Sequence, residues 1–164
     1  MTVDLGRLIE SRLSALVGLR LLGIGRAADM ATLTFGSSDD DPRPWHLHVQ
    51  CAWRLEGPEG IITGRADLWD SENPDDPAWL EIPHAYDRYR NLLDARLDRF
   101  HRETDSLPEA RILTAVCADA LGGFELDLSG GFRVAVFPGS SRGEHWRLFR
   151  RGGGEHFVVP PKGS

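Results

Sequence analysis

The segment from Trp45 to Trp69 constrains the fold most strongly, because apolar and polar residues alternate almost without interruption along its first half. Side chains on a strand point alternately to the two faces of a sheet. The apolar parity holds Trp45, Leu47, Val49, Cys51, Trp53 and Leu55, and the other parity holds His46, His48, Gln50, Arg54 and Glu56. Residues 56–60 are typical of a turn because they contain two glycines and a proline. The segment therefore predicts a long hairpin with an aromatic inner face and a charged outer face.

The second arm of this hairpin continues the pattern, with Ile62, Ala66 and Leu68 on one face and Thr63, Arg65 and Asp67 on the other. If Arg54 lies across from Thr63, then Arg65 and Asp67 lie near Ala52 and Gln50. Such a polar network is either a solvated sheet face or the rim of a binding surface. The residues that we select as candidate ligand or partner contacts are His46, His48, Gln50, Arg54, Arg65 and Asp67.

His46 and His48 are also the one pair that could begin a metal site, because two histidines two positions apart on a strand share a face. Asp67 or His84 could supply a third ligand. The spacing resembles the first motif of cupins, but that family has a glutamate soon after the second histidine, and here the next acid is Glu56. We therefore expect no metal and no cofactor.

Two short motifs suggest catalysis and fail on their context. Residues 23–28 (GIGRAA) match a dinucleotide-binding pattern, but a strand-like segment follows where the pyrophosphate would need a helix N-terminus. Residues 139–143 (GSSRG) match a nucleophile elbow, but a strand follows again and no aspartate lies downstream. We expect turns at both places and assign no catalytic residue.

The composition is that of a soluble globular protein, and 164 residues suffice for a single α+β domain spanning residues 1–164. A formal charge of -6 argues against a general nucleic-acid binder, although Arg142, Arg147, Arg150 and Arg151 are interleaved with aromatic residues near the end of the chain. No apolar run is long enough to span a membrane, and no secretory signal is evident, so we expect a cytoplasmic protein. Cys51 and Cys117 are expected to be buried, reduced thiols.

Helical spacing of apolar residues predicts an N-terminal helix over residues 3–17 and a longer helix from Pro83 to about residue 102. Between the hairpin and the second helix, residues 70–83 (DSENPDDPAWLEIP) predict an acidic crossover loop. The remaining predicted strands are 19–24, 30–35, 111–117, 124–128, 132–136, 144–150 and 155–159. The expected fold is therefore α+β, with a mainly antiparallel sheet of about eight or nine strands.

A faint internal echo is present, because ATLTFG followed by WHLHV resembles FELDLSGGFRVAV in its alternation. Each copy follows another strand and, before that, a helix. The echo suggests two related halves, although most half-buried hairpins share such alternation.

The phrases LHVQCAWRLEGPEGIITGRADLW and SGGFRVAVFPGSSRGEHWRLF resemble a set of small uncharacterised proteins from GC-rich Gram-positive bacteria. In layout the chain is similar to small α+β proteins assigned as immunity proteins of polymorphic toxin systems. The second resemblance implies a non-catalytic protein that binds a partner, and it transfers no site residue.

These observations lead us to expect a protein-binding domain, immunity-like, that acts through an acidic or polar surface and takes a protein partner. This expectation rests on the negative charge of the chain together with the acidic segments 39–41 and 70–76. The alternative is a small-molecule-binding protein or enzyme with a pocket at the polar face of the 45–69 hairpin. A homodimer that pairs through a strand edge is the third possibility.

Overall fold

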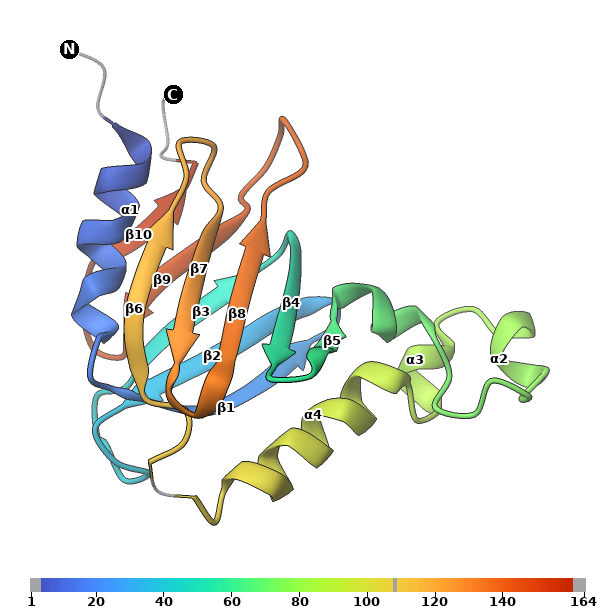
Figure 1. The fold of residues 1–164 in the computed structure, drawn as a ribbon. Coiled ribbons are helices and arrows are strands. Elements are labelled where there is room, and N and C mark those ends of the chain that lie inside the picture. The colour runs from blue at the N-terminus through green and yellow to red at the C-terminus, as the bar shows by residue number, and fades with distance from the viewer. Residues whose placement is uncertain (1–3, 108, 161–164) are drawn as a thin grey trace.

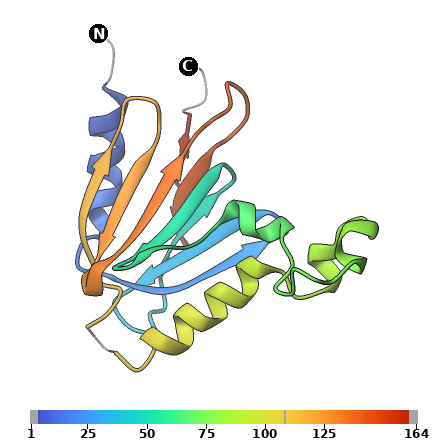
Figure 2. The same cartoon turned by 45° about the vertical axis from the view of Figure 1, so that its right-hand side comes forward.

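A computed structural model describes residues 4–107 and 109–160 of the chain. Within them, ten antiparallel strands form two five-stranded sheets, which Figures 1 and 2 show stacked face to face. The α+β class with mainly antiparallel sheet is confirmed, with ten strands in place of eight or nine. The buried apolar side chains of both sheets and of the two longer helices form one hydrophobic cluster.

Each sheet contains strands from both halves of the chain. Sheet A has the order β1 (Arg20–Ala27), β2 (Met30–Gly36), β3 (Trp45–Val49), β9 (Trp146–Arg150) and β10 (His156–Val159). Sheet B has the order β6 (Leu113–Ala118), β7 (Phe124–Leu128), β8 (Phe132–Phe137), β4 (Ala52–Gly57) and β5 (Gly60–Gly64). A short 3₁₀ turn, η3 (Ser129–Gly131), joins β7 to β8.

These two orders are the same order repeated. In each half of the chain, three consecutive strands form a meander in one sheet, and the next two form a hairpin that joins the other sheet. Strand β1 therefore corresponds to β6, β2 to β7, β3 to β8, β4 to β9 and β5 to β10. The internal echo in the sequence paired β2–β3 with β7–β8, and the topology places those strands in equivalent positions.

The repeat holds at the level of single residues. Trp146 pairs with Val49 across β9 and β3, and Trp53 pairs with Val136 across β4 and β8. Both tryptophans begin the triplet Trp-Arg-Leu, and both are buried. The indole N–H of Trp146 donates to the Gly122 carbonyl (2.8 Å), so this buried donor has a hydrogen-bond partner within the protein.

A helix closes each open side of the sandwich. Helix α1 (Leu5–Leu13), continued by the 3₁₀ turn η1 (Ser14–Leu16), packs against β6 and inserts Ile9 and Leu13 into the core. Helix α4 (Leu92–Thr104) packs against β1 and β5 and inserts Leu93, Leu97 and Phe100. Figure 1 shows the two helices on different sides of the sandwich. Residue 3, where the sequence placed the start of the first helix, lies outside the described residues.

The prediction of one long hairpin over residues 45–69 is wrong in two respects. Its first arm is two strands, because the chain bends at Gln50 and Cys51 and passes from sheet A to sheet B. Its second arm ends at Gly64, and residues Arg65–Trp69 form the 3₁₀ helix η2. The parity prediction is confirmed along the first arm, since Leu47, Val49, Cys51, Trp53 and Leu55 are buried. These side chains face the opposite sheet, and the two longer helices cover the open sides of the sandwich.

The mid-chain helix begins later than predicted. Asn91 caps α4, because its side-chain oxygen accepts the Asp94 N–H (2.7 Å), and the backbone at Tyr89 is extended. Upstream lie two short helices, α2 (Ala78–Glu81) and α3 (Ala85–Arg88). The expected crossover loop is therefore partly helical, and Figures 1 and 2 show it projecting from the sandwich.

The second rejected motif lies in a loop as expected, whereas the first was expected to be a turn and is mostly strand, with the turn only at Ala28 and Asp29. Gly23 and Gly25 lie in β1, and β2 follows directly. Residues 139–143 form the loop between β8 and β9. The cysteine prediction is only half right, because Cys51 is buried and Cys117 is exposed, and both are free thiols. Within the described chain, no helix has the length and apolar character to span a membrane.

Candidate functional site

The candidate residues from the sequence fall into three separate places. His46 and His48 project from β3 on the outer face of sheet A, and Gln50 lies in the bend that follows. Arg54 lies on β4, on the outer face of sheet B. Arg65 and Asp67 lie in η2. Arg54 pairs with Gly64, and Thr63 pairs with Leu55, so the assumed register is wrong and the polar residues do not form one network.

The two histidines belong to an aromatic cluster that the sequence did not indicate. Phe149 on β9 stacks on His46 (ring centroids 5.2 Å apart) and on His156 of β10 (4.6 Å), and His48 meets its edge (4.8 Å). Burial lowers the pKa of His46, as does the Arg151 charge. Burial also lowers the pKa of His48, with His46 and Arg147 adding to it. Among residues 4–107 and 109–160, no group of three or more His, Cys, Asp or Glu side chains could hold a metal ion.

The remaining four candidates each take a local partner. The Arg54 guanidinium binds Glu56 (2.5 Å) and lies over the Phe137 ring, and Gln50 donates to Glu144 (3.4 Å). Arg65 binds Asp29 (2.8 Å) and lies over Trp69.

Asp67 accepts the hydroxyl proton of the buried Thr63 (2.7 Å) and so ties η2 to β5. Burial raises the pKa of the nearby Cys51 thiol to about 11, which disfavours the nucleophilic thiolate form at neutral pH. Through these contacts the four side chains bind neighbouring residues of the same protein and stabilise the fold.

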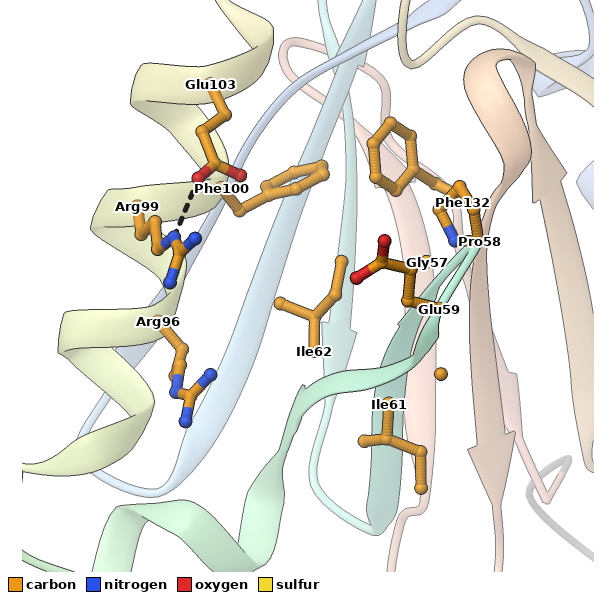
Figure 3. A pocket seen from close by; sticks show the side chains of 11 residues that line it. Gly57, Pro58, Glu59, Ile61, Ile62, Arg96, Arg99, Phe100, Glu103 and Phe132 are labelled. Carbon is orange, nitrogen blue, oxygen red and sulfur yellow. Dashed lines mark hydrogen bonds and ion pairs between the residues drawn. The ribbon is translucent and has the colours of Figure 1, made fainter.

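The structure instead shows a groove beside the turn of the β4–β5 hairpin, which we call groove 1. It has a volume of about 530 Å³ and lies between that turn and α4. Figure 3 shows Ile62, Phe100 and Phe132 at its centre, with Glu59 directed toward them from the turn. Phe100 and Phe132 meet edge to face (5.2 Å). On the α4 side, Arg99 is bound by Glu103 (2.7 Å).

The other half of the chain forms an equivalent groove, which we call groove 2. It has a volume of about 650 Å³ and lies between α1 and the β9–β10 hairpin. Trp45 at the start of β3 takes the place that Phe132 at the start of β8 has in groove 1, because the two strands share the same register. The charged side chains of groove 2 are Arg12, Arg43, Arg150 and Glu155. The two grooves therefore share a position in the repeat and differ in charge.

A third feature is the projecting segment of residues 70–90, which we call the arm. It carries six carboxylates and two guanidinium groups, and so a net charge of -4 out of -6 for the whole chain. At its base, Ser71 pairs with Asn91, and the Leu92 N–H donates to the Asp70 carbonyl (2.8 Å). Inside it, the buried Trp79 donates its indole N–H to the Trp69 carbonyl (2.8 Å). The arm is therefore an ordered projection.

The sequence shows that the arm is acidic, but it does not reveal that the arm contains short helices and projects from the sandwich. The prolines at 74 and 77 favour a loop, and the spacing of Trp79, Leu80 and Ile82 is too short to reveal a helix. The grooves could not be found from the sequence, because each is lined by segments far apart along the chain. The one available signal was the internal echo, which implies that any cavity in one half has a counterpart in the other.

Comparisons with known proteins assign no function to this chain, so a functional assignment rests on the two grooves and the arm. No protein-family model, curated protein or solved structure matches this chain significantly.

Proposed function

We propose that this protein is a non-catalytic protein-binding domain, as the immunity-like layout implies, and that its arm contacts the partner. The observation that carries the proposal is Leu80, whose exposed fraction of 90% is the largest among the exposed large apolar residues in the described chain. It lies on α2, in the part of the molecule that projects furthest in Figures 1 and 2. A single exposed leucine is ordinary on a protein surface, but its position on a projecting, acidic segment makes Leu80 a candidate for a contact that a partner covers.

The charges of the arm indicate the chemistry of that partner. Glu72 binds Arg90 (2.7 Å) and Asp87 lies near Arg26 (3.9 Å), so these carboxylates are used within the molecule. Asp70, Asp75 and Glu81 take part in none of the ion pairs formed among the described residues. These three carboxylates lie on the same arm as Leu80, and a fourth, Asp76, accepts the Ala78 N–H (3.0 Å). The arm therefore complements a basic surface with an apolar hollow, and complementary charge accelerates association.

The second acidic segment contributes less to this surface. Asp41 accepts hydrogen bonds from the Ser37 N–H (2.9 Å) and the Arg43 N–H (2.9 Å), and these bonds lower its pKa. Asp39 lies near Arg20 (3.6 Å). Asp39 and Asp41 are therefore engaged within the protein at the β2–β3 loop, so this segment contributes less negative charge to a partner than the arm does.

The test compares partner capture by two matched variants, Leu80→Ser on the arm and Leu121→Ser in the β6–β7 turn. Both remove a highly exposed leucine (90% and 82% exposed), but only the first lies on the arm. Immobilised protein is exposed to an extract of the native cells at low salt, and captured proteins are identified by mass spectrometry. We expect a basic protein that binds the wild type and Leu121→Ser, is lost with Leu80→Ser, and is released by salt. Capture of no protein at low salt, or equal capture by both variants, contradicts the proposal.

One observation favours the alternative of a small-molecule site in the 45–69 segment. The turn of the β4–β5 hairpin forms one wall of groove 1, whose apolar floor and volume of about 530 Å³ fall in the range of ligand pockets. This site would lie beside the turn and away from the polar face where the sequence placed it. Amide shifts confined to residues 57–62 and α4, on titration with a fragment library, would support it.

A further inference from the structure

Groove 2 has a charge opposite to that of the molecule. Its lining contains three arginines, Arg12, Arg43 and Arg150, and one acid, Glu155. The protein as a whole has a formal charge of -6. A concave surface that keeps an excess of positive charge on an acidic protein attracts anions.

Two of these guanidinium groups are held in place by aromatic rings of the groove. Arg150 lies over Trp45 (5.4 Å to the ring centroid), and its Nε donates to the Arg43 carbonyl (2.8 Å). Arg12 lies over Phe157 (5.5 Å). A guanidinium beside an aromatic ring retains N–H groups that can donate to an acceptor, and its forked geometry suits a carboxylate.

The charged side chains of groove 2 are only weakly compensated by ion pairs within the described protein. Arg12 lies 3.7 Å from Glu155, but the side chains are 47% and 80% exposed, and such ion pairs contribute little. Arg43 and Arg150 form none of the ion pairs seen among residues 4–107 and 109–160. In groove 1, by contrast, Glu103 binds Arg99 at 2.7 Å, and Glu59 adds a second carboxylate. The two grooves therefore occupy equivalent positions in the repeat and differ in their charged side chains.

The floor of groove 2 is apolar. Leu8 from α1, Leu148 from β9 and the two aromatic rings line it, in a volume of about 650 Å³. That volume lies within the usual range of about 300–1,000 Å³ for small-molecule sites. The groove thus combines an apolar body with a positively charged edge.

We propose that groove 2 binds a small amphiphilic carboxylate, with the apolar body on Leu8, Leu148 and Trp45 and the carboxylate between Arg12 and Arg150. The bidentate match of guanidinium to carboxylate, together with the stacked arginines, favours this class over a neutral apolar molecule. This site is separate from the arm, so its failure leaves the proposed protein partner untouched.

The experiment titrates the whole protein, near neutral pH, with octanoate, with octan-1-ol as the neutral analogue and with acetate as the analogue without a tail. Binding is followed by amide shifts in NMR spectra. We expect octanoate to saturate, with shifts in α1 and in β9–β10, and we expect octanol and acetate to bind at least about tenfold more weakly. Higher salt should weaken octanoate and leave octanol unchanged.

Matched variants locate the site. Arg12→Gln/Arg150→Gln should weaken octanoate by about tenfold or more, because it removes both charges and both guanidinium forks while keeping an uncharged polar side chain at each position. Arg96→Gln/Arg99→Gln makes the same change in groove 1 and should have no effect. Arg43→Gln, at an exposed position, gives a second readout if the double variant does not fold. Equal binding of octanol, no saturable binding of octanoate, or an equal loss in the groove 1 variant overturns the proposal.

Discussion

At the scale of single residues, two helix side chains satisfy backbone groups that an edge strand leaves unpaired. The Ile24 N–H of β1 donates to His101 Nε2 on α4 (3.1 Å), and the Ala118 N–H of β6 donates to Glu10 on α1 (3.1 Å). Strands β1 and β6 are equivalent edges of the two sheets. Covering an edge in this way protects it from pairing with another chain.

The role of His101 makes stability depend on pH. Burial lowers its pKa, and the nearby Arg111 charge adds to the effect, so the folded protein holds the ring neutral. The unfolded chain has the higher pKa, about 6.5, and therefore takes up the proton first. The stabilisation is complete above about pH 6.5 and is lost as the pH falls through the folded-state pKa. Urea midpoints measured between about pH 8 and pH 5 should fall with acidity.

His101→Gln is the control for that prediction, because an amide oxygen accepts the Ile24 N–H without titrating. The variant should show a shallower pH dependence than the wild type. Some dependence should remain, since His46 and His48 also have lowered pKa values. An unchanged pH profile would show that His101 does not hold this bond in the neutral form.

Arg111 is a second residue whose environment has a measurable consequence. Its side chain is 1% exposed and binds Asp105 (2.7 Å), while its Nε and Nη1 atoms have no protein partner. Asp105→Asn removes the carboxylate that binds this guanidinium and should cost about 1–3 kcal/mol of unfolding free energy. Glu103→Gln, which breaks the exposed pair with Arg99, should cost about 0.5 kcal/mol or less. Equal losses in urea denaturation would show that burial of Arg111 gives the pair no special weight.

At the scale of elements, α4 begins where a buried cap permits it. Asn91 is fully buried, and its amide donates to Asp94 (2.8 Å) and to the Tyr86 carbonyl (3.3 Å) while its oxygen caps the helix. Asp94 in turn binds Arg26 of β1 (2.8 Å). The sequence placed the start at Pro83 because proline suits a first turn, but the helix begins after Asn91, whose buried side chain caps it and binds Tyr86 and Asp94.

Asn91→Ala should therefore cost about 2 kcal/mol, at the upper end of the range for N-caps, because it also leaves buried partners unpaired. Asp4→Ala at the exposed cap of α1 is the matched change and should cost about 0.5–1 kcal/mol. Thermal or urea unfolding of the two variants checks the order. A larger loss in Asp4→Ala would contradict the role given to Asn91.

At the scale of the whole molecule, the fold is two similar halves that exchange hairpins. The alternation in the sequence predicted which side of each strand is buried, as Leu47, Val49, Trp53 and Leu55 confirm. It could not predict the change of sheet at Gln50 and Cys51, because the apolar parity continues through the bend and is the same in both sheets. The six candidate site residues were chosen as one surface. The bend separates His46 and His48 from Arg54, and the end of β5 places Arg65 and Asp67 in η2.

The exchange of hairpins predicts a single cooperative unfolding transition. Neither sheet is complete without a hairpin from the other half, and the buried residues of both sheets form one cluster. Urea unfolding followed by far-ultraviolet circular dichroism and by tryptophan fluorescence should therefore coincide. Two separated transitions would mean that the halves fold independently.

The proposal for the arm is tested most directly by hydrogen exchange of the protein alone and in complex with its captured partner. We expect slowed exchange in residues 70–90, around Leu80, with the outer faces of both sheets unchanged. Protection on the face that carries His46 and His48, with an unchanged arm, would contradict the account.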